Sequence, residues 1–220
     1  SSDHALSWAR DEAARLDADV RAVLAWEVPA FMVSPSVLSV STSPSAIVED
    51  AARETIEEVA RTAEKGAGPL TTVLRHGPVV AELLAEVDEH DAELVVVGTR
   101  GLGAVGRVLL GSASARLARE APVPVAVVPE GAPIGSDGPL VVGVDGSAGS
   151  IASLRWAAAT RHPIVAVHVI EYPFGPDYAI EGLTFDDHET FGREVVEKTL
   201  AAAVDDPSGV DGPGLVFRVR

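Results

Sequence analysis

A short stretch rich in glycine constrains the fold of this chain more than any other feature. It runs from Glu93 to Ser114 and opens with an unbroken apolar run, Leu94 to Val97, which is typical of a strand buried on both faces of a parallel sheet. Five glycines follow within fourteen residues, at Gly98, Gly101, Gly103, Gly106 and Gly111. Glycine at this density predicts positive φ angles or a close approach to the backbone. The stretch therefore predicts a strand that leads into a loop lying close to another molecule.

A helix start follows the glycines. Ser112, Ala113 and Ser114 come first, and a serine there is able to cap free N–H groups. A strand, a glycine loop and a helix N-terminus together form an anion site, because backbone N–H groups converge and the helix dipole adds positive potential. Arg100 and Arg107 would add charge beside a phosphate, although each is equally suited to pairing with helix carboxylates.

Two familiar phosphate motifs do not account for the glycines. The P-loop requires Gly-Lys-Ser or Gly-Lys-Thr, and the stretch has no lysine. The dinucleotide pattern G-x-G-x-x-G occurs at Gly101, Gly103 and Gly106, but it requires a helix to begin within the motif. Here the helix start lies at Gly111, so the dinucleotide interpretation is disfavoured.

The spacing resembles the nucleotide-binding signature of the universal stress protein family, Gly-x2-Gly-x9-Gly-Ser/Thr. Gly98, Gly101, Gly111 and Ser112 match it position for position, and the segment from Ala121 to Val128 resembles the last strand of that family. The resemblance implies that the glycines and the serine at the helix start hold the phosphates and ribose of ATP. Magnesium is an optional companion of the nucleotide.

The resemblance also implies contacts to the base. In the family an aspartate at the end of the first strand meets the adenine, and in the second half of this chain that position is Asp145. Ala25 and Val169 lie in strands whose backbone would face the base. An equally good interpretation of Asp145 is a cap for the helix that starts near Ser147 or Ser150.

Short strands alternate with helices along the chain, which predicts an α/β fold with a parallel sheet and right-handed crossovers. The resemblance implies an open five-stranded sheet in the order 3-2-1-4-5. The expected helices are 1–16, 47–65 and 79–89, and the expected strands are 20–26, 70–75, 94–97, 123–128 and 140–145.

An internal repeat predicts two tandem domains. Leu154 to Ala157 repeats Leu6 to Ala9 at an offset of 148, and a proline-rich and glycine-rich linker at 129–139 separates the copies. The first domain, 1–130, lacks its opening strand, and the second, 139–220, stops after its third strand. Both copies are incomplete, which predicts a fragment of a longer tandem protein.

Composition excludes several classes of function. The formal net charge of −16 argues against nucleic acid as a partner. No segment reaches the roughly 18 apolar residues of a membrane span, no signal peptide is recognised, and the absence of cysteine fits a reducing compartment, so the cytoplasm is expected. The six histidines have no metal-ligand spacing, so no metal centre is predicted. Ser112 lacks the Gly-x-Ser-x-Gly elbow of a nucleophile, so no catalytic residue is predicted.

These observations predict a nucleotide-binding stress-response protein that acts by a nucleotide-dependent change of shape or partner, with slow ATP hydrolysis at most. The resemblance implies a homodimer formed through the strand from Val123 to Val128. Two alternatives remain open from the sequence. One is an adenylating or ATP-hydrolysing α/β enzyme, and the other is a nucleotide-free interaction scaffold.

Overall fold

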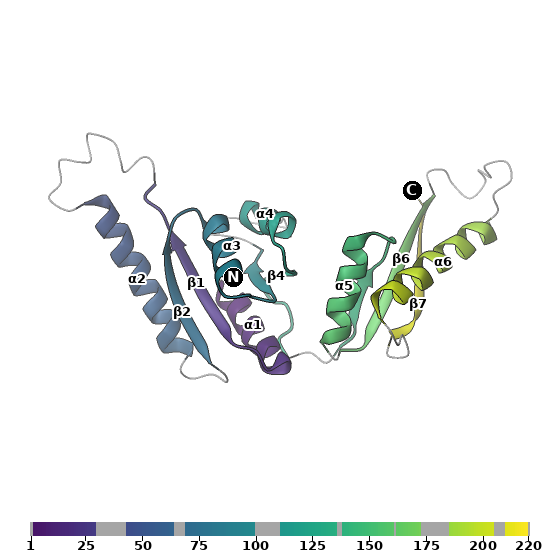
Figure 1. Cartoon of the computed structure of the whole chain (residues 1–220), viewed down its shortest axis with the longest axis horizontal. Coiled ribbons are helices and arrows are strands. Elements are labelled where there is room, and N and C mark those ends of the chain that lie inside the picture. The colour runs from purple at the N-terminus through teal and green to yellow at the C-terminus, as the bar shows by residue number, and fades with distance from the viewer. Residues whose placement is uncertain are drawn as a thin grey trace. The chain divides into compact units, whose positions relative to one another are not determined.

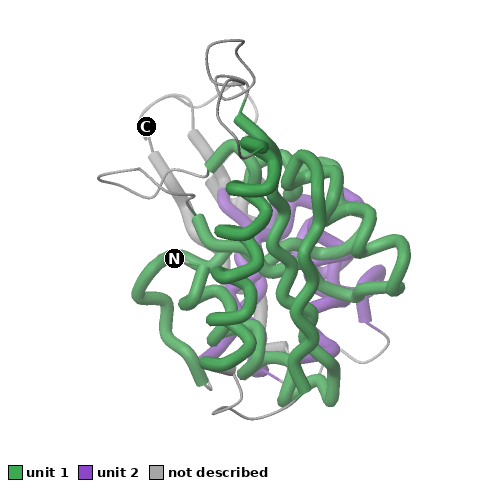
Figure 2. Tube along the Cα trace, turned by 90° about the vertical axis from the view of Figure 1, so that its left-hand side faces the viewer, with its two compact units in different colours: residues 1–135 green, residues 136–220 purple. Residues whose placement is uncertain are grey.

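The computed structural model describes residues 2–29, 43–63, 69–99, 111–135, 138–160, 162–172, 185–204 and 210–219. The chain divides into two compact units, which comprise Ser1–Gly135 and Ser136–Arg220 and are coloured separately in Figure 2. Each unit is described by itself below.

Unit 1 alternates helices with short strands (Figure 1). Its elements are α1 (Ser2–Leu16), β1 (Val20–Trp26), α2 (Pro44–Ala63), β2 (Leu70–His76), α3 (Val79–Glu89), β3 (Val95–Gly98), α4 (Ser112–Glu120) and β4 (Val125–Val128). Unit 2 continues with β5 (Leu140–Gly143), α5 (Ala148–Ala159), β6 (Ile164–Tyr172), α6 (Phe185–Ala203) and β7 (Val210–Val219).

All strand pairs in the described residues are parallel, which confirms the predicted α/β class. In unit 1, β1 pairs with β2 and β3 pairs with β4, as two separate two-stranded sheets. Helix α1 contacts strands of both sheets, and α3 packs on β1 and on α4. These two helices therefore hold the two strand pairs of unit 1 together.

The core of unit 1 lies around α3, α4 and the second strand pair. Val80 and Val87 from α3 pack against Val95 of β3 and the fully buried Leu117 of α4. Ala113, near the start of α4, and Val97 of β3 also pack against this cluster, so it fixes the position of that helix relative to the end of β3.

Unit 2 has one three-stranded sheet in the order β5-β6-β7. Helices α5 and α6 pack against each other and against the sheet. Its core consists of alternate residues of β5 and β6 together with residues of the two helices, namely Val142, Val144, Leu154, Ala157, Ile164, Ala166 and Val196. The five-stranded order 3-2-1-4-5 remains a prediction for both units.

Several element ends differ from the expected ones for simple chemical reasons. Helix α2 begins at Pro44 rather than at Ile47, because proline is well suited to the first helical position. Strand β4 begins at Val125 rather than at Val123, since Pro122 and Pro124 lack the N–H that a strand ladder uses. None of the described helices is long and apolar enough to cross a membrane.

Candidate functional site

The predicted phosphate site lies where β3 leads to α4. Gly98 ends β3 and pairs with Val128 of β4. The next residue, Thr99, is buried, and its N–H donates to the carbonyl of Val128 at 3.3 Å. Its own carbonyl accepts a hydrogen bond of 2.9 Å from the N–H of Gly111. The chain therefore leaves the sheet at Thr99 and returns to the same point at Gly111.

The segment between these two residues carries three of the predicted contacts. Arg100, Gly101 and Arg107 lie outside the described residues, so their roles stay predictions. What the structure does describe is the frame on either side of them, Gly98 on the strand and Gly111 at the helix.

Gly111 is the N-cap residue of α4, with φ −64° and ψ 157°, and no side chain caps the helix from this position. The carbonyl of Gly111 accepts from the Ala115 N–H at 2.9 Å and from the Ser114 hydroxyl at 3.0 Å. The first N–H groups of a helix have no partner within the helix itself. With glycine at the cap, no side chain of the cap residue binds these donors, which lie at the positive end of the helix dipole.

The three residues that follow Gly111 differ in accessibility. Ser112 is exposed, Ala113 packs against the unit 1 core, and Ser114 is buried. The Ser114 hydroxyl donates to the Gly111 carbonyl, so it serves the turn. Of the two serines, Ser112 is therefore the one whose side chain is exposed at the start of α4.

Asp145 follows β5 in unit 2, where its carboxylate organises the turn before α5. Its Oδ1 accepts from the Ser147 N–H at 2.9 Å, and its own N–H donates to the Ser150 hydroxyl at 3.4 Å. Hydrogen bonds from Ser147, first from its side chain and then from its backbone, together with Ser150, lower the pKa of Asp145 to about 2. The carboxylate is exposed and ionised at neutral pH. The N-cap of α5 is Ser147, whose hydroxyl accepts from the Ser150 N–H, so Asp145 holds the turn before the cap and is not the cap itself. The adenine contact of Asp145 stays a prediction.

The two predicted base-facing positions lie in strands, as expected. Ala25 is in β1, half-buried and opposite Arg75 of β2. Val169 is in β6 opposite Val216 of β7, and its side chain is exposed. Both lie near the carboxyl ends of their strands, where open α/β sheets bind ligands.

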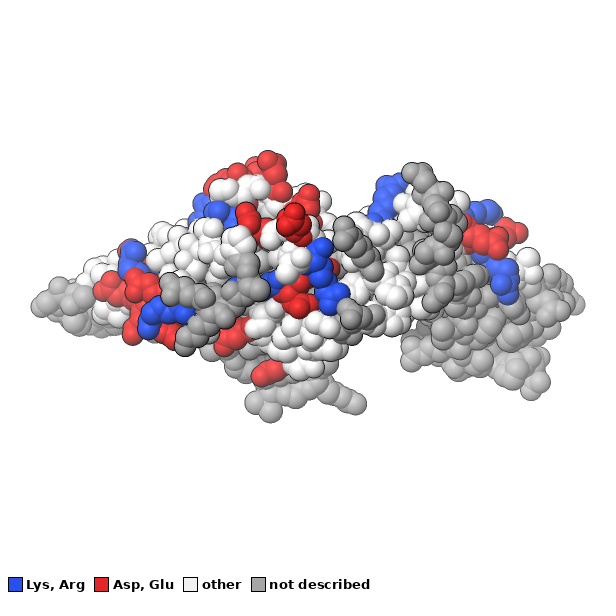
Figure 3. All heavy atoms as spheres, turned by 90° about the horizontal axis from the view of Figure 1, so that it is seen from below, with Lys and Arg blue, Asp and Glu red and all other residues white. Residues whose placement is uncertain are grey.

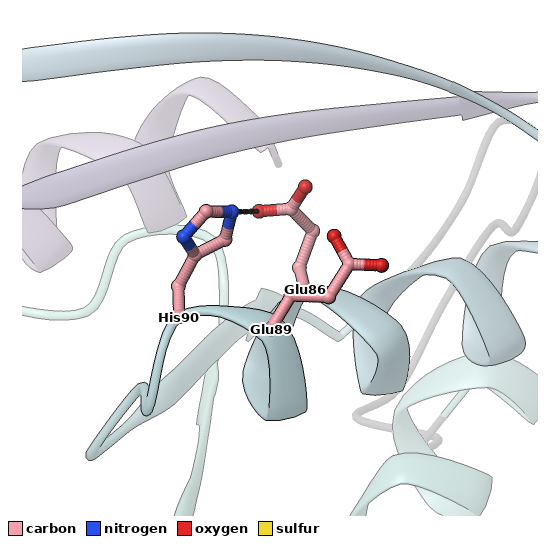
Figure 4. Close-up of side chains that lie close together, drawn as sticks. All are labelled: Glu86, Glu89 and His90. Atoms are coloured by element: carbon pink, nitrogen blue, oxygen red, sulfur yellow. Dashed lines mark ion pairs between the residues drawn. The ribbon is translucent and has the colours of Figure 1, made fainter.

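A charged cluster on α3 was missed by the sequence analysis. The side chains of Glu86, Glu89 and His90 lie close together (Figure 4). Each places one ligand atom within 4.8 Å of the others. The Glu86 side chain is only 6% exposed and accepts from Arg75 Nε at 2.7 Å and from Arg21 Nε at 3.0 Å. Arg75 also bonds to Glu89. Two guanidinium groups already occupy the carboxylates, so the cluster is an ion-pair network that ties α3 to β1 and β2.

The charges of this network are mutually stabilising. Burial raises the pKa of Glu86, but the hydrogen bonds from Arg75 and Arg21 outweigh it and lower the pKa overall. Hydrogen bonds that Arg75 donates to Glu89 and then to Glu86 raise the pKa of Arg75. The signal in the sequence was the spacing of Glu86, Glu89 and His90, which is that of residues on one side of a helix; Glu86 and Glu89 belong to α3 and His90 is its C-cap. Their arginine partners could be identified only from the strand register.

Elsewhere on the surface, opposite charges lie close together. On the face in Figure 3, acidic and basic side chains of the described residues are neighbours rather than segregated. Pairs one helical turn apart, such as Arg53 with Glu49 on α2 and Arg116 with Glu120 on α4, bring opposite charges together within single helices. Surface pairs of this kind contribute little to stability.

Comparison with known proteins identifies the family. Residues 1–129 match the Universal stress protein family. A universal stress protein of Mycolicibacterium smegmatis is 32% identical over 221 residues, which cover 91% of this chain and 70% of that protein. The chain belongs to the universal stress protein family.

Other members of the family show how the chain relates to them. A universal stress protein of Mycobacterium tuberculosis is 38% identical over 128 residues, which cover 56% of this chain and 39% of that protein. A crystal structure of a universal stress protein from Archaeoglobus fulgidus aligns with the whole chain at a TM-score of 0.62 and 16% identity, and the alignment covers 75% of that structure. This last likeness supports the fold.

Proposed function

We propose that unit 1 binds an adenine nucleotide, ATP in the first place, with its phosphates at the N-terminus of α4. One observation carries the proposal. The Thr99–Gly111 hydrogen bond joins the end of β3 to the start of α4, and the N-cap of that helix has no side chain, so the first N–H groups of α4 lie at the carboxyl end of β3. Backbone donors and a helix dipole at such a point suit phosphate.

Residues of the glycine signature supply the remaining contacts in this proposal. Gly98 and Gly101 allow the phosphates to approach the backbone, and the exposed Ser112 hydroxyl donates to a phosphate or ribose oxygen. Arg100 and Arg107 add local positive charge, which a chain of net charge −16 needs in order to attract an anion. Magnesium, if present, would be held chiefly by the phosphate oxygens.

The proposal includes the family fold for both units. Residues 1–130 and 139–220 are two universal stress protein domains in tandem, each built on the order 3-2-1-4-5. The order counts the strands of a complete domain, and the first domain lacks strand 1 of that count. The observed pairs β2-β1 and β3-β4 therefore correspond to places 3-2 and 4-5, and β7-β6-β5 in unit 2 corresponds to places 3-2-1. In unit 2, Asp145 and the backbone near Val169 would meet the base, as Ala25 would in unit 1.

The wider role follows from binding rather than from catalysis. Bound nucleotide would change the shape or partners of a cytoplasmic stress-response protein. The homodimer would form through the segment 123–128, because β4 pairs with β3 on one edge and is the last strand of its sheet.

The test is a nucleotide-binding measurement on Gly111→Val. The φ and ψ of Gly111 lie in the extended region that valine readily adopts, so the backbone is kept while a branched side chain fills the space above the helix end. We expect wild-type protein to bind ATP in isothermal titration calorimetry and the variant to lose at least about 100-fold in affinity, the scale of losing two good anion contacts.

The matched control is Gly143→Val in β5, where an added Cβ would meet no atom within 4 Å. This variant should bind ATP as the wild type does. Equal ATP affinity of wild type and Gly111→Val would overturn the phosphate assignment. Circular dichroism of both variants separates lost binding from lost folding.

A further inference from the structure

The peptide group between Val144 and Asp145 is held at both of its ends. Its carbonyl, that of Val144, accepts a hydrogen bond of 2.6 Å from the imidazole of His168. Its N–H, that of Asp145, donates to the Ser150 hydroxyl at 3.4 Å. The carbonyl and the N–H belong to one planar unit, so two bonds at opposite ends fix the orientation of the plane. One side chain of β6 and one of α5 therefore set the direction in which the chain enters Asp145.

His168 lies on the face of β6 that points into the core of unit 2. Ile164 and Ala166 of the same strand are buried, and side chains two residues apart share a face, so His168 follows them on that face. His168 itself is half-buried, and Val144 is only 3% exposed. A buried carbonyl needs a hydrogen-bond partner, and the imidazole supplies one to the Val144 carbonyl.

The chemistry of this bond settles which ring nitrogen carries a proton. A carbonyl oxygen only accepts hydrogen bonds, so Nδ1 of His168 is the donor. A proton is on Nδ1 in one neutral tautomer and also in the imidazolium form, so acidification does not remove the bond. His168 can therefore hold the peptide plane throughout the pH range in which a carboxylate titrates.

The internal repeat has a different residue at this position of unit 1. Glu171-Tyr172-Pro173 matches Glu27-Val28-Pro29 at an offset of 144, which aligns His168 with Leu24 of β1. Among the residues of unit 1 that the structure describes, β1 pairs with β2 alone. Leu24 thus has no strand like β5 beside it in this part of the chain. The imidazole occurs in the unit where a neighbouring strand leads into an aspartate.

We propose that His168 is a positioning residue: by holding the Val144 carbonyl, it fixes the Asp145 carboxylate for contact with a nucleotide base at the carboxyl edge of unit 2. The inference rests on the proposed function for that contact. His168 acts through Asp145 and does not itself touch the base. Without the imidazole the peptide plane is free to rotate, so the bonds that Asp145 makes with Ser147 and Ser150 weaken.

The first readout is the titration of Asp145, which needs no ligand and is followed by the amide signal of Ser147 in NMR spectra. In wild type the midpoint should correspond to the Asp145 pKa of about 2. His168→Leu has no N–H and should raise the midpoint by about half a pH unit, a fraction of one hydrogen bond to a charged group. His168→Asn carries an amide N–H as many bonds from Cα as Nδ1 is, and it should restore the wild-type midpoint.

Thr160→Val is the matched control. Thr160 is 3% exposed, and its hydroxyl donates to the Ala157 carbonyl at 2.7 Å, so this variant also loses one buried bond from a side chain to a carbonyl of unit 2. Thr160 is the C-cap of α5, at the opposite end of that helix from Ser147, and the Asp145 midpoint should not change. No rise in His168→Leu, or an equal rise in Thr160→Val, would overturn the positioning role.

The donor itself is tested by the remaining variants. A raised midpoint that His168→Asn did not restore would show that the shape of the ring matters and would reject the role of the N–H. If circular dichroism shows that His168→Leu does not fold, His168→Phe keeps a planar ring without a donor in this position and should give the raised midpoint instead. A wild-type midpoint in a folded His168→Phe would contradict the proposal.

The second readout tests the contact with the base. Adenosine, which has no phosphate, should shift the Ser147 amide of wild type in a saturable way, and His168→Leu should weaken its binding about fivefold. Unchanged adenosine affinity in His168→Leu would show that the positioning does not serve the base. If adenosine shifts no amide of this turn in wild type, the base contact of unit 2 is rejected, and the Asp145 titration still decides whether His168 positions the carboxylate.

Discussion

Helices α4 and α5 begin in nearly the same way and differ at one side chain. Each N-cap carbonyl, that of Gly111 or of Ser147, accepts from a serine hydroxyl three residues later at 3.0 Å, from Ser114 and Ser150 respectively. In α5 the Ser147 hydroxyl also accepts from the Ser150 N–H at 3.2 Å. Gly111 has no hydroxyl to do so. The difference shows that a serine at the cap binds a helix N–H with its own side chain, whereas a glycine at the cap has no side chain to do so.

The largest expected effect is the loss of stability when the buried leucine that anchors each helix is truncated. Leu117 of α4 and Leu154 of α5 are both fully buried. We expect either leucine-to-alanine variant to lose about 3 kcal/mol of its unit's unfolding free energy, from lost apolar burial and the cavity left behind. Urea unfolding would measure this loss.

The two variants should differ in nucleotide binding. Leu117→Ala loosens the cluster beneath α4, so ATP affinity in unit 1 should fall. Leu154→Ala lies in the other unit and should leave that affinity as it is. An equal fall in ATP affinity in both variants would show that the effect is not specific to the core beside α4.

The next effect comes from giving α4 the cap of α5. Gly111→Ser should place a hydroxyl where it accepts from the Ser114 N–H, in competition with a phosphate. We expect ATP affinity to fall about tenfold, the equivalent of about one hydrogen bond to a charged group. Calorimetric titration of ATP measures it. Gly111→Ala has no hydroxyl and serves as the control, and an equal loss in both variants would mean that bulk rather than capping is responsible.

A smaller effect is expected from removing the α5 cap. Ser147→Ala should lower the unfolding free energy of unit 2 by about 1 kcal/mol, since the Ser150 N–H loses its partner. Ser153→Ala, on the same helix, removes a hydroxyl that donates to the Gly149 carbonyl and should have a weaker effect. Thermal or urea unfolding of the two variants compares them directly. A larger loss in Ser153→Ala would show that the cap does not stabilise α5.

The smallest effect is a pH dependence of the α5 turn. The pKa of Asp145 is lowered in the folded chain to about 2 from a usual value of 3.8, so its stabilising contribution is present above the usual value and is lost as the pH falls towards 2. The amide signal of Ser147 in NMR spectra should therefore titrate with a midpoint well below 3.8. Asp145→Asn should remove this titration. A midpoint at or above 3.8 would contradict the hydrogen-bonded turn.

Much of the fold could be predicted because it depends on local patterns. The apolar run before Gly98 and the helical spacing between Val79 and Glu89 identify β3 and α3 without reference to the rest of the chain. The Glu86 network could not be predicted in the same way. It requires Arg21 and Arg75 to come to one side of α3, which depends on the packing of that helix and on the pairing register of β1 with β2.

The candidate site also has features that the sequence could predict and features that it could not. The glycine signature and the helix start at Ser112 could be identified from spacing. The hydrogen bond from Gly111 to Thr99 could not, because it joins residues twelve positions apart and depends on how α4 packs on the core. The sequence also could not show that Ser114 is buried while Ser112 is exposed, since both serines fit a helix start equally well.

The bond between Thr99 and Gly111 has a consequence for evolution. Because one hydrogen bond joins the two ends of the segment, positions outside the glycine signature can change in sequence while the strand and the helix on either side keep their places. Natural variation can therefore accumulate there at little thermodynamic cost, and descendants of one scaffold can acquire different ligand preferences without having to evolve a new framework.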